Sequence, residues 1–184
     1  MVDLSTDRIL NIDAHSHDVE CLEMDYSGTL VASASKKGTI IRVFRTKDGS
    51  VLQEFRRGID NAKIMSLCFD VSGLMLGLSS DSGTIHLYAI KDEESDRDSA
   101  VSNKKSKFSF LKKSIKYFDS EWSSLQLKVD EKIVFVNFNA ESTSILVYKS
   151  TGKFWTYELP REGDKVKDKK KIELTDPIRL LKQA

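Results

Sequence analysis

The sequence lacks the long hydrophobic runs and the excess of one charge that mark several common classes of protein. No stretch of its 184 residues approaches the roughly 18 consecutive apolar residues of a membrane-spanning helix. The N-terminus also shows no signal-peptide pattern. With 29 Lys and Arg against 28 Asp and Glu, the net charge of +1 argues against a generally basic nucleic-acid-binding protein.

Cysteine is scarce as well. Cys21 and Cys68 are far apart, and each lies within a short apolar run. This placement predicts small buried thiols rather than a disulfide or half of a metal site. It indicates a reducing, cytosolic compartment.

The motifs of common enzymes are missing. The sequence has no glycine-rich phosphate loop between a strand and a helix, no nucleophile elbow and no paired-carboxylate motif. Its three histidines form no ligand spacing with Cys or Asp, and His15 and His17, which flank one serine, are too little for a metal site. We therefore expect no enzymatic activity, no metal and no cofactor.

What the sequence has is an internal repeat. Residues 18–44, 62–88 and 131–157 can be laid over one another, and Gly38-Thr39-Ile40 matches Gly83-Thr84-Ile85 at an offset of 45. Each copy has three strand-like segments joined by turns and ends in an aromatic residue. This pattern, with a period of about 40 to 45 residues, is typical of a propeller blade. The predicted fold class is all-β, a WD-repeat-like β-propeller.

A fourth strand is expected after each copy, at 51–55, about 122–129 and 171–174. The sequence then holds about three four-stranded blades, with boundaries at 14–58, 59–129 and 130–176. Residues 8–13 resemble the outermost strand of a preceding blade. Because closed propellers usually have four to eight blades, we expect either that the chain is the C-terminal part of a larger propeller or that another element covers its open sides.

A long insertion, 91–121, interrupts the second blade. Residues 103–118 carry six lysines and no acid, and four apolar residues form a stripe if the segment is helical. Such a segment suits the interface of an anionic membrane. The alternative is a disordered, solvated loop, which is also the default interpretation of the charged run at 161–171. The candidate membrane-contact residues are Phe108, Phe110, Leu111, Lys112, Lys113, Ile115 and Lys116.

The tetrapeptide Phe55-Arg56-Arg57-Gly58 closes the first blade. Side chains alternate along a strand, so two adjacent arginines point to opposite faces and can serve two different pockets. Arginine holds phosphate through two parallel hydrogen bonds. The pair therefore predicts two anion pockets, one on each side of the blade; the alternative is that it only makes a strand end soluble.

These features resemble the PROPPIN family, WD-repeat-like propellers that bind polyphosphoinositides. The resemblance rests on Ser35-Lys-Lys-Gly-Thr39-Ile-Ile-Arg42-Val-Phe, on the Phe-Arg-Arg-Gly tetrapeptide that follows, and on the long insertion in the next blade. It covers nearly the whole chain and is most like the branch called homologous with swollen vacuole. It implies a seven-bladed ring with two lipid-headgroup sites and a membrane-inserting loop.

Carried over to this sequence, the resemblance implies two groups of headgroup-binding residues. The first comprises His15, Ser35, Thr39, Arg42 and Arg56. The second comprises Arg57, Ser82, Thr84 and His86. Both histidines could instead be core or blade-bridging residues, and Ser82 and Thr84 could be ordinary turn and strand residues.

The expected function is therefore a non-enzymatic, peripheral membrane protein for phosphatidylinositol 3-phosphate and phosphatidylinositol 3,5-bisphosphate. The resemblance implies a role in autophagy and in endosomal or vacuolar membrane traffic, in the cytoplasm and on endosomal, vacuolar or pre-autophagosomal membranes. The expected partners are phosphoinositide-containing membranes and autophagy-machinery proteins, and not nucleic acid. The alternative is a WD-repeat-like protein–protein interaction scaffold that binds an acidic or phosphorylated partner.

Overall fold

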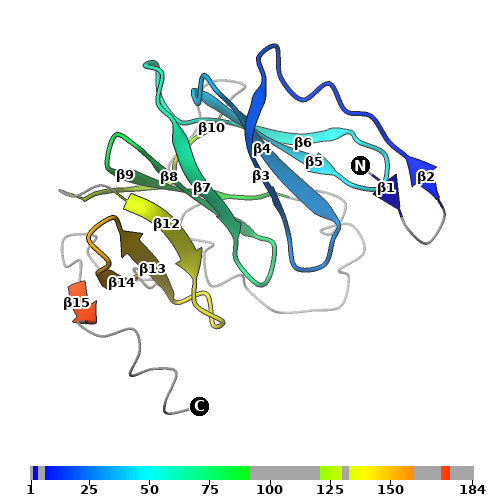
Figure 1. The fold of residues 1–184 in the computed structure, drawn as a ribbon. Helices are drawn as coiled ribbons and strands as arrows, with labels where there is room; N and C mark the ends of the chain where they lie inside the picture. The colour runs from blue at the N-terminus through cyan, green and yellow to red at the C-terminus, as the bar shows by residue number, and fades with distance from the viewer. Residues whose placement is uncertain (1, 4–6, 92–120, 130–132, 160–170, 175–184) are drawn as a thin grey trace.

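The computed structural model describes residues 2–3, 7–91, 121–129, 133–159 and 171–174 (Figure 1). Within these ranges the regular structure consists of strands alone, in three twisted sheets that lie side by side and a short two-stranded ribbon. The candidate membrane-contact residues of the insertion, from Phe108 to Lys116, lie outside the described residues, as do all residues of the charged run at 161–171 except Lys171.

The first sheet has five strands in the order β10-β6-β5-β4-β3. Four of them pair antiparallel in chain order, and the fifth joins the outer edge in parallel, with Glu121 opposite Phe55 and Trp122 opposite Arg56. The strands are β3 (Val19–Met24), β4 (Leu30–Ser35), β5 (Ile40–Arg45), β6 (Val51–Arg56) and β10 (Glu121–Trp122).

The other two sheets have four antiparallel strands each, in the orders β11-β9-β8-β7 and β12-β13-β14-β15. The second comprises β7 (Ile64–Phe69), β8 (Met75–Ser80), β9 (Thr84–Ala89) and β11 (Leu125–Lys128). The third comprises β12 (Ile133–Phe138), β13 (Ser144–Lys149), β14 (Phe154–Glu158) and β15 (Lys171–Leu174). The inner strands β3, β7 and β12 are neighbours across the sheets.

The repeat extends to the hydrogen bonds of the first turn in each sheet. Asp25 accepts the N–H of Leu30 at 2.7 Å through Oδ1, and Asp70 accepts the N–H of Met75 at 2.8 Å in the same way. In the third sheet Asn139 Oδ1 takes this place at 2.8 Å from the nitrogen of Ser144. A short acceptor side chain at this point satisfies backbone donors that the turn leaves without a ladder partner.

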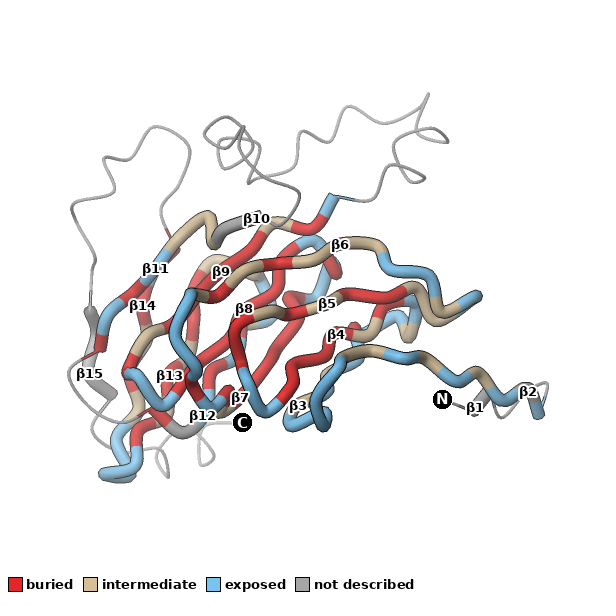
Figure 2. Tube along the Cα trace, turned by 90° about the horizontal axis from the view of Figure 1, so that it is seen from above, coloured by how far each residue is buried: buried red, intermediate tan, exposed pale blue. Residues whose placement is uncertain are grey.

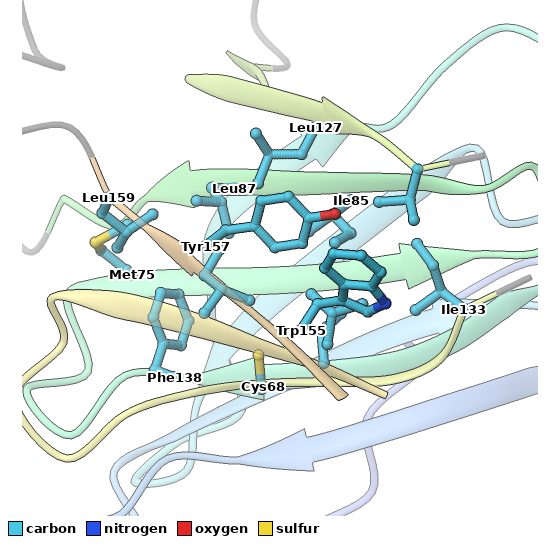
Figure 3. Close-up of a cluster of buried hydrophobic side chains, with 14 residues drawn as sticks. Cys68, Met75, Ile85, Leu87, Leu127, Ile133, Phe138, Trp155, Tyr157 and Leu159 are labelled. Atoms are coloured by element: carbon cyan, nitrogen blue, oxygen red, sulfur yellow. The ribbon is translucent and has the colours of Figure 1, made fainter. Parts of the chain in front are cut away.

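Two apolar cores join the three sheets. In β5, Ile41 and Val43 are fully buried and pack towards the second sheet, whereas the alternate residue Arg42 points to the other face. The second core lies between the second and third sheets and includes Trp155 and Tyr157 (Figure 3). Burial is accordingly concentrated in the middle strands and falls off in the turns (Figure 2).

The structure differs from two expectations about the outer strands. Residues 8–13 do not form the outer strand of another blade: β2 (Arg8–Ile9) pairs with β1 (Val2–Asp3), since an edge strand pairs with the nearest available backbone. Residues 122–129 are not one strand, because they are divided between β10 of the first sheet and β11 of the second. The blade boundaries 14–58, 59–129 and 130–176 remain a proposal.

Both cysteines are free thiols, but only Cys68 is fully buried, and Cys21 is half-buried. Burial raises the pKa of the Cys68 thiol to about 12, which makes it unreactive at neutral pH.

In the described part of the chain, no helix has the length and apolar character needed to cross a bilayer.

Candidate functional site

Arg56 and Arg57 lie on opposite sides of the first sheet. Arg56, the last residue of β6, is opposite Ile40 of β5 and therefore shares a face with Arg42, two residues further along that strand. Arg57 is only 8% exposed and approaches His86 of the second sheet closely enough to lower the pKa of that imidazole. One arginine thus belongs to the outer face of the first sheet, and the other to the space between the first two sheets.

The guanidinium of Arg57 is fixed by backbone carbonyl groups. Its Nε donates to the carbonyl oxygen of Gly38 at 2.8 Å, and its Nη2 donates to that of Asp60. Its own backbone N–H donates to the carbonyl oxygen of Thr39 at 2.9 Å. Arg57 is therefore held in place by the turn between β4 and β5 and by the segment that follows β6.

The outer face carries a polar group around Arg42. Its Nε and Nη2 both donate to Oε2 of Glu54 at 2.9 Å, and its Nη1 donates to the carbonyl oxygen of Ala14 at 2.6 Å. Next to it, Nε2 of His15 shares a hydrogen bond of 2.8 Å with Oγ of Ser33. Burial, with a contribution from the positive charge of Arg42, lowers the pKa of His15.

The residues expected in the first headgroup site are only partly brought together. His15 and Arg42 are close. Ser35 and Thr39 make their hydrogen bonds with backbone atoms: the carbonyl oxygen of Ser35 accepts the N–H of Gly38 at 2.8 Å, and the carbonyl oxygen of Thr39 accepts the backbone N–H of Arg57. Both are buried, at 6% and 7% exposed.

Ser33 and Glu54 were not found from the sequence. Both lie two residues before a predicted site residue in the same strand, Ser33 before Ser35 and Glu54 before Arg56. That spacing places them on the same face as the predicted residues, and it is the signal that could have revealed them.

The second group lies at the end of the second sheet that faces Arg57. Nδ1 of His86 is 3.2 Å from Oγ of Ser123, a residue that also had no signal in the sequence. Ser82 is exposed and shares a hydrogen bond of 2.7 Å with Ser80, as expected for a turn residue. Thr84 is half-buried and begins β9. This group therefore combines one fixed cation with a hydroxyl and an imidazole.

His86 is uncharged at neutral pH. It is 4% exposed, and desolvation, together with the nearby Arg57, lowers its pKa to about 4. It can donate or accept a hydrogen bond in this state but adds no positive charge to the group.

This shift predicts a pH dependence of stability. The folded chain disfavours the charged form of His86, so the unfolded chain binds a proton at a higher pH than the folded chain does. The contribution of neutral His86 to the free energy of unfolding is therefore fully present above the unfolded pKa of about 6.5 and is lost as the pH falls towards about 4. Urea unfolding at pH 7 and pH 5 should therefore show a smaller difference for His86→Gln than for the wild type. His17→Gln, at an exposed histidine, is the control, and equal differences in all three proteins would contradict the prediction.

Among the described residues, no group of three or more His, Cys, Asp or Glu is placed to hold a metal ion.

Comparison with known proteins identifies the fold. A family model described as PROPPIN matches residues 3–113. SVP1-like protein 2 of Pichia angusta is 34% identical over 159 residues, which are 84% of this chain and 44% of that protein. Autophagy-related protein 18e of Arabidopsis thaliana is 34% identical over 148 residues, or 79% of this chain and 38% of the relative.

Among solved structures, Kluyveromyces lactis Hsv2 with a complete loop 6CD superimposes with a TM-score of 0.62 at 28% identity, over 80% of this chain and 44% of that one. The chain thus spans less than half the length of each of these proteins. The residues matched by the family model include both arginines and strands β3 to β9, and end before β10 and β11. The chain belongs to the PROPPIN family, and its sheets are blades of a β-propeller.

Proposed function

We propose that the chain is a non-enzymatic, peripheral membrane module that binds phosphatidylinositol 3-phosphate and phosphatidylinositol 3,5-bisphosphate. The observation that carries the proposal is the placement of the two arginines on opposite sides of one blade: Arg56 on the face that carries Arg42 and His15, and Arg57 beside His86. Arginine matches phosphate oxygens with paired donors, and neutral donors around it add hydrogen bonds without adding repulsion.

The two pockets would act together. A basic residue near an anionic membrane surface contributes about 1 kcal/mol, so either pocket alone gives weak binding. Carried on one rigid blade, both headgroups are bound by the same molecule, and the second binding event becomes intramolecular. Flotation should accordingly decrease as salt is added.

The two described ends of the insertion both lie against β6. The N–H of Lys91, where it starts, donates to Oε1 of Gln53 in β6 at 2.8 Å. At its end, β10 pairs with Phe55 and Arg56 of the same strand. Both ends are therefore held by the strand that ends in Arg56, which supports the proposal that residues 108–116 contact the membrane next to the headgroup pockets.

The proposed cellular role is supported by the family. Membership of the PROPPIN family and the autophagy-related name of the Arabidopsis relative support a role in autophagy and in endosomal or vacuolar traffic. We propose that the chain acts in the cytoplasm, on endosomal, vacuolar or pre-autophagosomal membranes, and that its protein partners belong to the autophagy machinery.

Flotation with liposomes tests the lipid-binding function. The chain should float with vesicles that contain phosphatidylinositol 3-phosphate and stay behind with vesicles that contain only unphosphorylated phosphatidylinositol. Arg56→Thr/Arg57→Thr should bind the first vesicles roughly 30-fold more weakly, the effect of two basic contacts.

The matched control is Arg45→Thr/Lys47→Thr, which removes the same charge at the opposite end of the same blade. Circular dichroism must show that both variants are folded. Equal loss of flotation in the two variants would mean that only total charge matters. Flotation that soluble inositol phosphate does not compete for would favour the scaffold function instead.

A further inference from the structure

The fourth strands of the first two blades end in the same register. In the first blade, the last three residues of β6 are opposite the first three residues of β5. In the second blade, the last three residues of β11 are opposite the first three residues of β9 in the same way. The pairs are Glu54–Arg42, Phe55–Ile41 and Arg56–Ile40 in the first blade, and Gln126–His86, Leu127–Ile85 and Lys128–Thr84 in the second. Lys128 therefore takes the place of Arg56, Gln126 that of Glu54, and His86 that of Arg42.

The alternation of the strand shows to which side Lys128 points. Leu127 and Ile85 are buried in the core shared with the third sheet. The residues next to them, Lys128 and Thr84, therefore face the first sheet, which is the side from which Arg57 approaches. Lys128 is exposed, and in an antiparallel pair its Cβ lies about 5 Å from that of Thr84.

The two groups differ in charge at one equivalent position. On the outer face, the carboxylate of Glu54 binds Arg42 and offsets its charge. In the second group the uncharged Gln126 stands there, and its Nε2 donates to Oγ of Ser123 at 3.0 Å. The second group thus combines the charges of Arg57 and Lys128 without a carboxylate at the position of Glu54.

We propose that Lys128 is the second cation of the Arg57 pocket, and that this pocket selects the doubly phosphorylated headgroup. The inference rests on the proposed function, because it assigns one of the two lipids to one of its pockets. A second phosphate adds a charge of about −1.5 to −2 to the headgroup. A pocket with two uncompensated cations therefore gains more binding free energy from that phosphate than a pocket in which a carboxylate offsets the charge of one cation.

Flotation of single variants on two kinds of vesicle tests the assignment. Lys128→Gln should weaken binding to vesicles with phosphatidylinositol 3,5-bisphosphate about five-fold and change binding to phosphatidylinositol 3-phosphate less than about two-fold. Gln126→Glu, which restores the carboxylate of the first blade, should weaken bisphosphate binding in the same selective way. Lys153→Gln, at an exposed lysine of the third blade, should change neither.

The outcomes separate the two proposals. A wild-type chain that floats with neither lipid overturns the proposed function and this inference with it. A wild-type chain that floats, with Lys128→Gln and Gln126→Glu losing both lipids equally or neither, overturns the inference alone. Urea unfolding of each variant shows whether it is folded, and two independent substitutions keep the test decisive if one of them is not.

Discussion

Replacing Phe55 by alanine is expected to lower the free energy of unfolding by roughly 3–5 kcal/mol, the usual effect of removing a fully buried aromatic ring. Phe55 is 0% exposed and stacks on Tyr88 of the second blade with ring centroids 4.6 Å apart. The truncation would leave a cavity between the first two blades, directly before the two arginines. Urea unfolding followed by circular dichroism measures the change.

Tyr26→Ala is the matched control, because Tyr26 is an aromatic residue of the same blade that is 89% exposed. Its loss should change stability by no more than about 0.5 kcal/mol. If the two substitutions had similar effects, the packing of the first blade against the second would not be the source of stability that the structure indicates.

Replacing Gly38 by alanine should be nearly as damaging, at roughly 3 kcal/mol. Gly38 has a φ of +63°, and a Cβ built on it would overlap the carbonyl oxygen of Ala62. The carbonyl group is backbone, and the position of a Cβ is fixed by the backbone that carries it, so the turn itself must move. The carbonyl oxygen of Gly38 also accepts the hydrogen bond from Arg57, and the variant should therefore weaken flotation as well as stability.

Gly152→Ala separates the cost of the positive φ from the cost of the overlap with Ala62. Gly152 has a φ of +78°, but no atom lies within 4 Å of a Cβ added to it. Its substitution should show only the penalty of the left-handed conformation, about 1–2 kcal/mol. The same loss of stability in both variants would show that contact with Ala62 contributes nothing.

The blades were predictable because each copy of the repeat carries its own short-range signals. Alternation marks the buried face of β5 through Ile41 and Val43, and a turn acceptor such as Asp70 recurs in each copy. The expectation that adjacent arginines point apart follows from the same alternation. None of these signals depends on where another part of the chain lies.

Contacts between strands were harder to foresee. Glu54 binds Arg42 only because β6 pairs with β5 in one particular register, and that register depends on a bulge near Val43. Gly38 precedes Gly83 by 45 residues and Phe44 precedes Tyr88 by 44, so the first copy has one extra residue in this interval. The structure places it at Thr39, which separates Gly38 from β5, whereas β9 starts directly after Gly83.

The insertion prevented the recognition of Lys128 as a candidate site residue from the sequence. It separates β9 from β11, so the equivalence of Lys128 with Arg56 cannot be recognised from a constant offset along the chain. It also ends in a two-residue strand that pairs with the first blade rather than the second. Both features depend on three-dimensional pairing, which no local pattern encodes.

Arg56 and Arg57 are proposed to belong to two separate headgroup pockets. Calorimetric titration of the folded chain with soluble inositol 1,3-bisphosphate, the headgroup of phosphatidylinositol 3-phosphate, tests this proposal most directly. Two binding sites are expected for the wild type and one detectable site for each of Arg56→Thr and Arg57→Thr, with binding too weak to detect in the double variant. A single site in the wild type that either substitution abolishes would contradict the proposal.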